Sequence, residues 1–189
     1  MDQIRTRKQL QEWLDIEMTK YGKRGRLDFL QLSEKAILRK HQNLLRKTEY
    51  FTNTGKKIRA KWYLFQLRKI QLKYSIHIPL NCCNLGLKIM HVGPILINGN
   101  AIVGKNCVFH INTSLVASGT SDDAPVLEEG VIVGIGAVVM GGIHIAKHIA
   151  IGANSVVNKS FEEENIAIAG VPARKVSNNG SLEWNKRGN

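Results

Sequence analysis

The chain has 189 residues, enough for one domain with a smaller appendage. Its 27 Lys and Arg outnumber its 15 Asp and Glu, and the excess lies in residues 1–80, which hold 19 basic and 7 acidic residues. No apolar run approaches the ~20 residues of a membrane-spanning helix and none follows the N-terminus, so neither a span nor a secretory signal is predicted.

Residues 1–74 are predicted to form a basic helical region. Leu, Gln, Lys, Arg and Glu predominate there, and this composition favours helices. Helices are expected over about residues 9–18, 27–47 and 56–73, with a break over residues 21–26, where two glycines fall close together.

The third expected helix is strongly basic, through Arg59, Lys61, Arg68, Lys69 and Lys73. These basic residues either form a solvated helix face or make a peripheral contact with an anionic surface such as lipid. No segment resembles a nucleic-acid-binding motif, so nucleic acid is not expected as a partner.

The middle of the chain, residues 75–160, carries a six-residue repeat. Every sixth position is apolar: Ile97, Val103, Phe109, Leu115, Leu127, Val133, Val139, Ile145, Ile151 and Val157. Ser121 interrupts the count within the polar run 118–125, which reads as a loop because the phase is the same on both sides. Period six fits neither a helix nor a lone strand and predicts a parallel β-helix with three units to a coil.

The repeat slips at one place. Cys83 and Ile89 keep the six-residue step, but the next in-phase residue is Ile97, eight positions on. The two extra residues surround His91, which marks this histidine as a candidate functional residue. The three cysteines, Cys82, Cys83 and Cys107, are odd in number and are expected to be free thiols in a reducing cytoplasm.

Residues 161–189 follow the repeat as a C-terminal extension. A charged turn over residues 158–164 ends the repeat, and residues 166–173 read as extended. The polar end, residues 178–189, is expected to fray.

Three segments, in this order, resemble the hexapeptide-repeat acyltransferases, and among them the serine O-acetyltransferases and their relatives in surface-polysaccharide biosynthesis. They are residues 89–98 (IMHVGPILIN), 151–157 (IGANSVV) and 169–173 (AGVPA). The resemblance covers roughly residues 45–177. It implies a mainly β fold, a left-handed parallel β-helix with an N-terminal α-helical region, and a homotrimer with sites between subunits.

The resemblance also implies the chemistry. His91 matches the family's catalytic histidine, a general base that takes the proton of an acceptor hydroxyl. Acetyl-CoA is the implied co-substrate, with no metal. The C-terminal extension would close its site, and the implied cofactor-binding residues are Gly119, Gly136, Ala137, Ala153, Asn154, Gly170, Pro172, Ala173, Arg174 and Lys175. The last two would pair with phosphates or are solvated tail charges.

The other histidines are weaker candidates. His110 is either a residue lining the site or a surface residue, and His41 and His77 are read as structural. His144 and His148 are four apart, but this spacing aligns side chains on a helix and not in a six-residue coil, so no metal site is expected.

The acceptor is predicted from positions where this sequence differs from the serine acetyltransferases that it resembles. Those carry Asp before the catalytic histidine where this chain has Met90, and a carboxylate near the start of the β-helix where it has Ser75 or Ile76. Because free serine needs paired counter-charges, a sugar or polysaccharide hydroxyl is the first reading, with Asp122 or Asp123 accepting its hydrogen bonds. Serine is the alternative acceptor, and a non-catalytic trimeric scaffold is the alternative of another class.

Overall fold

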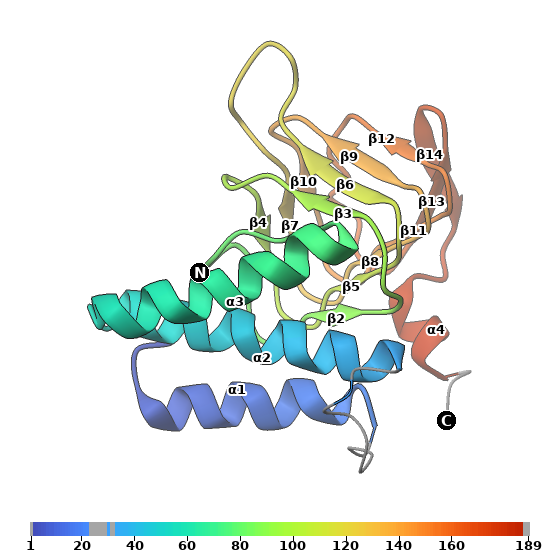
Figure 1. Ribbon diagram of the computed structural model, residues 1–189. Coiled ribbons are helices and arrows are strands. Elements are labelled where there is room, and N and C mark those ends of the chain that lie inside the picture. The colour runs from blue at the N-terminus through green and yellow to red at the C-terminus, as the bar shows by residue number, and fades with distance from the viewer. Residues whose placement is uncertain (1, 23–29, 31–32, 187–189) are drawn as a thin grey trace.

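The computed structural model describes residues 2–22, 30 and 33–186, with the backbone alone for residues 184–186. Three N-terminal helices lie at one end of a stack of short strands, and a C-terminal hairpin lies at the opposite end of the stack (Figure 1). The predicted mainly β fold with parallel strands and N-terminal helices is confirmed.

The helices are α1 (Arg7–Thr19), α2 (Glu34–Asn53) and α3 (Lys57–Tyr74). Thr6 and Gln9 form a capping box that starts α1, and the Ser33 hydroxyl accepts a backbone N–H at the start of α2. The second helix was predicted to end near residue 47, but α2 continues to Asn53, just before Gly55 with φ of +68°. The predicted helix start at Leu27, and most of the predicted break, lie outside the described residues.

The strands build three sheets, here called A, B and C. Sheet A has the order β1-β3-β6-β9-β12, sheet B the order β4-β7-β10, and sheet C the order β2-β5-β8-β11-β13-β14. The strands are β1 (Ile76–His77), β2 (Lys88–Ile89), β3 (Ile95–Ile97), β4 (Ile102–Val103), β5 (Val108–Phe109), β6 (Thr113–Val116), β7 (Val126–Leu127), β8 (Ile132–Val133), β9 (Val138–Met140), β10 (His144–Ile145), β11 (Ala150–Ile151), β12 (Val156–Val157), β13 (Ala167–Gly170) and β14 (Ala173–Ser177). Each coil takes one strand from sheets C, A and B in turn.

Strand register follows from the repeat. Paired residues in neighbouring coils are 18 apart in the regular part, as Val126 and His144 are, and 24 apart across the 117–125 loop, as Ile102 and Val126 are. The loop therefore adds one six-residue unit and leaves the phase unchanged. The ten in-phase apolar residues are at most 3 % exposed and fill the interior of the prism.

A buried ionic network joins the helices to the first coil. The Arg46 guanidinium donates to Glu17 at 2.7 Å and to Glu49 at 2.9 Å, and all three side chains are buried. Arg46 also donates to the carbonyls of Cys83 and Asn84, so it satisfies backbone groups that the coil leaves unpaired. The helical region is thereby fixed to the β-helix by hydrogen bonds as well as by apolar packing.

The C-terminal segment is more ordered than predicted. β13 turns back into β14 as an antiparallel pair, and α4 (Ser181–Lys186) follows. Ser181 is buried, and its hydroxyl donates to the Gly130 carbonyl at 2.6 Å while its N–H donates to the His148 carbonyl at 2.8 Å. The prediction that the end frays from residue 178 is therefore wrong at this residue, because these bonds fix it to a corner of the β-helix. Residues 187–189 lie outside the described residues.

Candidate active site

His91 lies in an insertion of the coil between β2 and β3. The pair Lys88 and Val108 is 20 residues apart, two more than the regular coil, so the predicted register slip is present. The insertion lies at the corner where sheet C passes into sheet A, here called the C–A edge. The His91 side chain is 51 % exposed, so its ring is accessible on the isolated chain.

A carboxylate from the helical region contacts this histidine. Nδ1 of His91 lies 3.2 Å from Oε2 of Glu34, and Oε1 of Glu34 accepts the backbone N–H of Val92 at 3.0 Å. Glu34 is the first residue of α2 and lies 57 positions before His91 in the chain. The bond from Val92 and, after it, the bond to His91 hold the pKa of Glu34 below its ordinary value.

His110 lies one coil further along the same edge. The register that pairs Lys88 with Val108 brings it beneath Met90, and its Nδ1 is buried without a hydrogen-bond partner among the described residues. Burial first, and then the charges of His91 and Lys88, lower its pKa. A neutral His110 therefore borders the site, and it has no described contact that would give it a role of its own.

Several predicted cofactor residues share the C–A edge with His91. Gly136 lies between β8 and β9, Ala153 and Asn154 lie between β11 and β12, and Gly170 ends β13. Gly136 has φ of +71°, and a Cβ there would lie 2.1 Å from Oδ1 of Asn154, so the corners stack closely along the axis. This edge therefore presents small corners in line with His91.

The remaining cofactor candidates differ in how far their side chains are exposed. Ala137 and Ala173 are buried, which leaves only their backbone for a ligand at the surface. Lys175 pairs with Glu163, whereas Arg174 and Pro172 are exposed.

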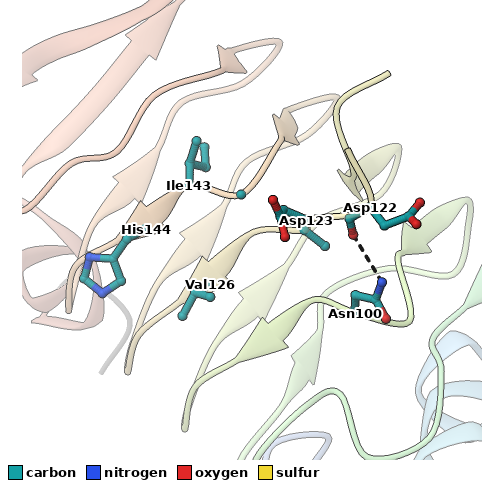
Figure 2. Close-up of a pocket in the computed structure, with 8 residues that line it drawn as sticks. Asn100, Asp122, Asp123, Val126, Ile143 and His144 are labelled. Atoms are coloured by element: carbon teal, nitrogen blue, oxygen red, sulfur yellow. Dashed lines mark hydrogen bonds between the residues drawn. The ribbon is translucent and has the colours of Figure 1, made fainter. Parts of the chain in front are cut away.

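The predicted acceptor residues lie on another edge. Asp122 and Asp123, with the exposed Gly119 nearby, belong to the loop where sheet A passes into sheet B, here called the A–B edge. The two aspartates line a hollow of about 450 Å³, and the Asn100 side-chain amide donates to the Asp122 backbone carbonyl at 3.1 Å (Figure 2). The lining residues are Asn100, Asp122, Asp123, Ala124, Val126, Gly142, Ile143 and His144. One chain thus brings His91 together with the cofactor corners at Gly136, Ala153 and Gly170, but not with the two aspartates or with Gly119, which was predicted to bind the cofactor.

The sequence reasoning missed the surroundings of His144. Its Nδ1 lies 2.7 Å from Glu162 and its Nε2 lies 3.2 Å from Glu128. Burial acts to lower its pKa, but the hydrogen bonds and charges of the two glutamates outweigh burial and raise it. Glu162 is 18 residues after His144, so the coil spacing was a usable signal for this pair.

His144 and His148 are not part of any candidate metal cluster among the described residues. His148 lies at the corner between sheets B and C, with φ of +59°, and stacks on Gly130. No group of three His, Cys, Asp or Glu side chains suited to a metal ion occurs in the described part of the chain. Within the same residues, no helix is long and apolar enough to cross a membrane.

Comparison with known proteins confirms the resemblance. No family model matches the chain. It is 32 % identical over 133 residues to the serine acetyltransferase of Haemophilus influenzae, a match that covers 69 % of this chain and 48 % of that enzyme. The serine acetyltransferase of Buchnera aphidicola is 30 % identical over 143 residues, with 72 % and 50 % covered. The chain thus spans about half the length of these curated relatives.

Solved structures show the same fold. A serine acetyltransferase in complex with cysteine superposes with a TM-score of 0.68 at 22 % identity, covering 90 % of this chain and 71 % of the other. The Brucella abortus serine acetyltransferase in complex with coenzyme A superposes with a TM-score of 0.66 at 20 % identity, covering 93 % and 70 %. The fold likeness includes the N-terminal helices as well as the coil.

Proposed function

We propose that this chain, a serine-acetyltransferase-like hexapeptide-repeat protein, is an acetyl-CoA-dependent O-acetyltransferase with His91 as its general base. The observation that carries the proposal is the place of His91. A half-exposed imidazole lies in an insertion of the coil, on the edge that also holds the small predicted cofactor corners Gly136 and Ala153.

The reaction needs one base and no covalent enzyme intermediate. The neutral His91 imidazole takes the acceptor hydroxyl proton through Nε2 as the hydroxyl oxygen attacks the thioester carbonyl carbon. The C–S bond then breaks, the imidazolium returns the proton to the leaving sulfur, and the acetyl ester and free coenzyme A result. Histidine suits this task because its ordinary pKa lies near neutrality.

Release of the coenzyme A thiol in the presence of an acceptor tests the proposal. We expect His91→Ala to lower kcat by about 100-fold or more, the effect of losing a general base, and to leave the fold intact. His148→Asn is the matched control, because His148 lies at the corner between sheets B and C, away from the C–A edge and from sheet A, and Asn tolerates its φ of +59°. Equal turnover by the wild type and His91→Ala would overturn the assignment of His91 as the base. No release of coenzyme A by the wild type with any acceptor would leave the non-catalytic scaffold as the better account.

Acetyl-CoA is placed along the C–A edge. Three coil steps of ~4.8 Å separate His91 from the corner at Ala153 and Asn154, about 14 Å along the axis, which an extended pantetheine arm spans. Gly136 and Ala153 present little side chain to that arm, and exposed Arg174 lies beyond them for a phosphate. A solved relative is described in complex with coenzyme A, which supports this co-substrate.

Serine becomes the first acceptor to test. The curated relatives reported above are serine acetyltransferases, and none of them supports the sugar acceptor favoured by the sequence alone. The sugar stays a second candidate because Met90, and either Ser75 or Ile76, stand where the resemblance implies the carboxylates of the serine enzymes. Coenzyme A release with L-serine, compared with a panel of nucleotide sugars, separates the two.

A trimer is proposed as the active unit. The support is that His91 and the loop carboxylates Asp122 and Asp123 lie on different edges of one prism, with sheet A between them. A neighbouring chain packed against sheet A would bring its A–B loop to the C–A edge of the first. We also infer a left-handed coil, on the resemblance to the hexapeptide-repeat family.

The outer face of α3 supports a peripheral contact with an anionic lipid surface. Ile58, Trp62, Phe65 and Leu72 follow one another at helical spacing and are each 55–88 % exposed. The helix carries six basic residues and no acidic residue, so it offers cationic as well as apolar contacts to an anionic surface. A second copy on the same stripe would bring like charges together, whereas anionic headgroups would neutralise them.

Vesicle sedimentation tests this contact. We expect the protein to bind vesicles that contain anionic lipid, to release them at high salt, and to bind far less well as the Trp62→Ala, Phe65→Ala variant. Equal binding to neutral vesicles, or no binding to either kind, contradicts it.

A further inference from the structure

His91 needs a partner that fixes its tautomer and its orientation. A neutral imidazole carries its proton on either nitrogen, and only a ring protonated on Nδ1 leaves Nε2 free to act as a base. A carboxylate that accepts from Nδ1 selects that tautomer and stabilises the imidazolium that forms. The residue directly before the histidine is Met90, which offers no carboxylate.

We propose that Glu34 is the positioning residue of His91, supplied from the start of α2 across 57 residues of chain. The inference rests on the proposed function for its catalytic consequence. Its geometry stands on the 3.2 Å contact between Oε2 of Glu34 and Nδ1 of His91. An ionised carboxylate can only accept, so Nδ1 of the neutral ring carries the proton in this contact.

Glu34 is itself held in place, which separates it from an ordinary surface ion pair. Its second oxygen accepts the Val92 N–H at 3.0 Å, so the carboxylate binds two consecutive residues of the insertion with two different atoms. Ser33 caps the helix directly before it through the bond from the Ala36 N–H. A carboxylate in the first turn is favoured by the helix dipole, and the charge is therefore kept where the ring needs it.

The arrangement gives the two-residue insertion a physical reason. The insertion displaces His91 and the Val92 N–H from the regular strand pairing, so that both reach Glu34 at the start of α2. The helical region thereby takes part in the site, because α2 places the carboxylate and the coil places the base. Both side chains are about half exposed, so the pair gains little stability by itself and its effect is expected in orientation and tautomer.

The test exchanges the carboxylate for an amide. We expect Glu34→Gln to lower kcat by about 10- to 100-fold with an unchanged KM for acetyl-CoA. This is less than the ~10⁴-fold loss when a buried triad Asp becomes Asn, because this pair is half exposed. An amide N–H facing Nδ1 would select the wrong tautomer, so Glu34→Gln should be at least as impaired as Glu34→Ala. Glu12→Gln, an exposed carboxylate on α1, is the matched control and should behave as wild type.

A spectroscopic measurement separates this proposal from the proposed function. In ¹⁵N spectra of histidine-labelled protein, assigned with His91→Ala, the His91 ring should be protonated on Nδ1 in the wild type. In Glu34→Gln the neutral ring should shift toward the other tautomer. Identical His91 ring signals in the two proteins overturn the pairing, whether or not the enzyme is active. A shifted tautomer in a protein without transferase activity upholds the pairing and removes only the proposed reaction.

Discussion

Replacement of Arg46 by Met is expected to remove much of the stability of the whole chain. The guanidinium is fully buried, with Glu17 at 2.7 Å and Glu49 at 2.9 Å. A methionine leaves both carboxylates buried without their cation, and breaking one buried pair in this way costs about 3–5 kcal/mol. The carbonyls of Cys83 and Asn84 lose donors as well.

These losses determine how far the free energy of unfolding should fall in Arg46→Met. Each buried carbonyl left without a donor costs about 1–3 kcal/mol, although the terms do not simply add. A total of about 4 kcal/mol or more is a large part of the ~5–15 kcal/mol that holds a typical domain folded. Burial raises the pKa of Glu49 and Arg46 opposes this, so removal of Arg46 should also favour its protonated form.

Urea unfolding followed by tryptophan fluorescence is the assay. Trp13 reports locally, because the Arg46 guanidinium lies 4.8 Å from the centre of its ring. Lys8→Met is the control, since Lys8 and Glu12 form an exposed pair at 4.0 Å worth at most about 1 kcal/mol. Both variants are compared at one protein concentration, because assembly shifts apparent stability. A loss for Arg46→Met no larger than that of the control would refute the reasoning.

Three further predictions follow from other parts of the structure. Burial lowers the pKa of His41 to about 4, so the folded state resists its protonation, and unfolding free energy should fall by about 3 kcal/mol as the pH drops from 6.5 to 4. His41→Leu should flatten that part of the urea-unfolding pH profile, and an unchanged slope would contradict it. Gly134→Ala should lower the free energy of unfolding in urea by about 1–3 kcal/mol, because the added Cβ would lie 2.6 Å from the Ile151 carbonyl oxygen; an unaltered free energy of unfolding would show that the corner relaxes. Arg174→Ala should raise KM for acetyl-CoA several-fold, whereas Lys175→Ala, already paired with Glu163, should change it less; equal effects would argue against a phosphate role for Arg174.

The coil was predictable because its cause is local. A six-residue period places one apolar residue inward from each short strand, and the residues so counted, from Ile97 to Val157, are buried. The same count located the insertion at His91, since two extra residues break a pattern that the neighbouring units keep. Helix boundaries were less predictable at α2, where Ser33 and Gly55 set the ends.

The partners of the site were not predictable, because they come from distant parts of the chain. Glu34 and His91 are 57 residues apart, and Arg46 reaches Cys83 across 37 residues, so no local spacing signals either contact. His91 and Asp122 are apart because they occupy different corners of the coil. This separation can be predicted once each strand is assigned to a sheet. It cannot be predicted from the residue types, which were the reason for choosing His91 and Asp122 as candidates.

The length of the polar loop between β6 and β7 has a consequence for how such a protein diversifies. Because the excursion adds one whole repeat, its removal or exchange would leave every later side chain facing as it does now. The loop proposed here to contact the acceptor could therefore differ in sequence without disturbing the coils that follow it. Other acceptors could then be accommodated at that corner while His91 and Glu34 keep their positions.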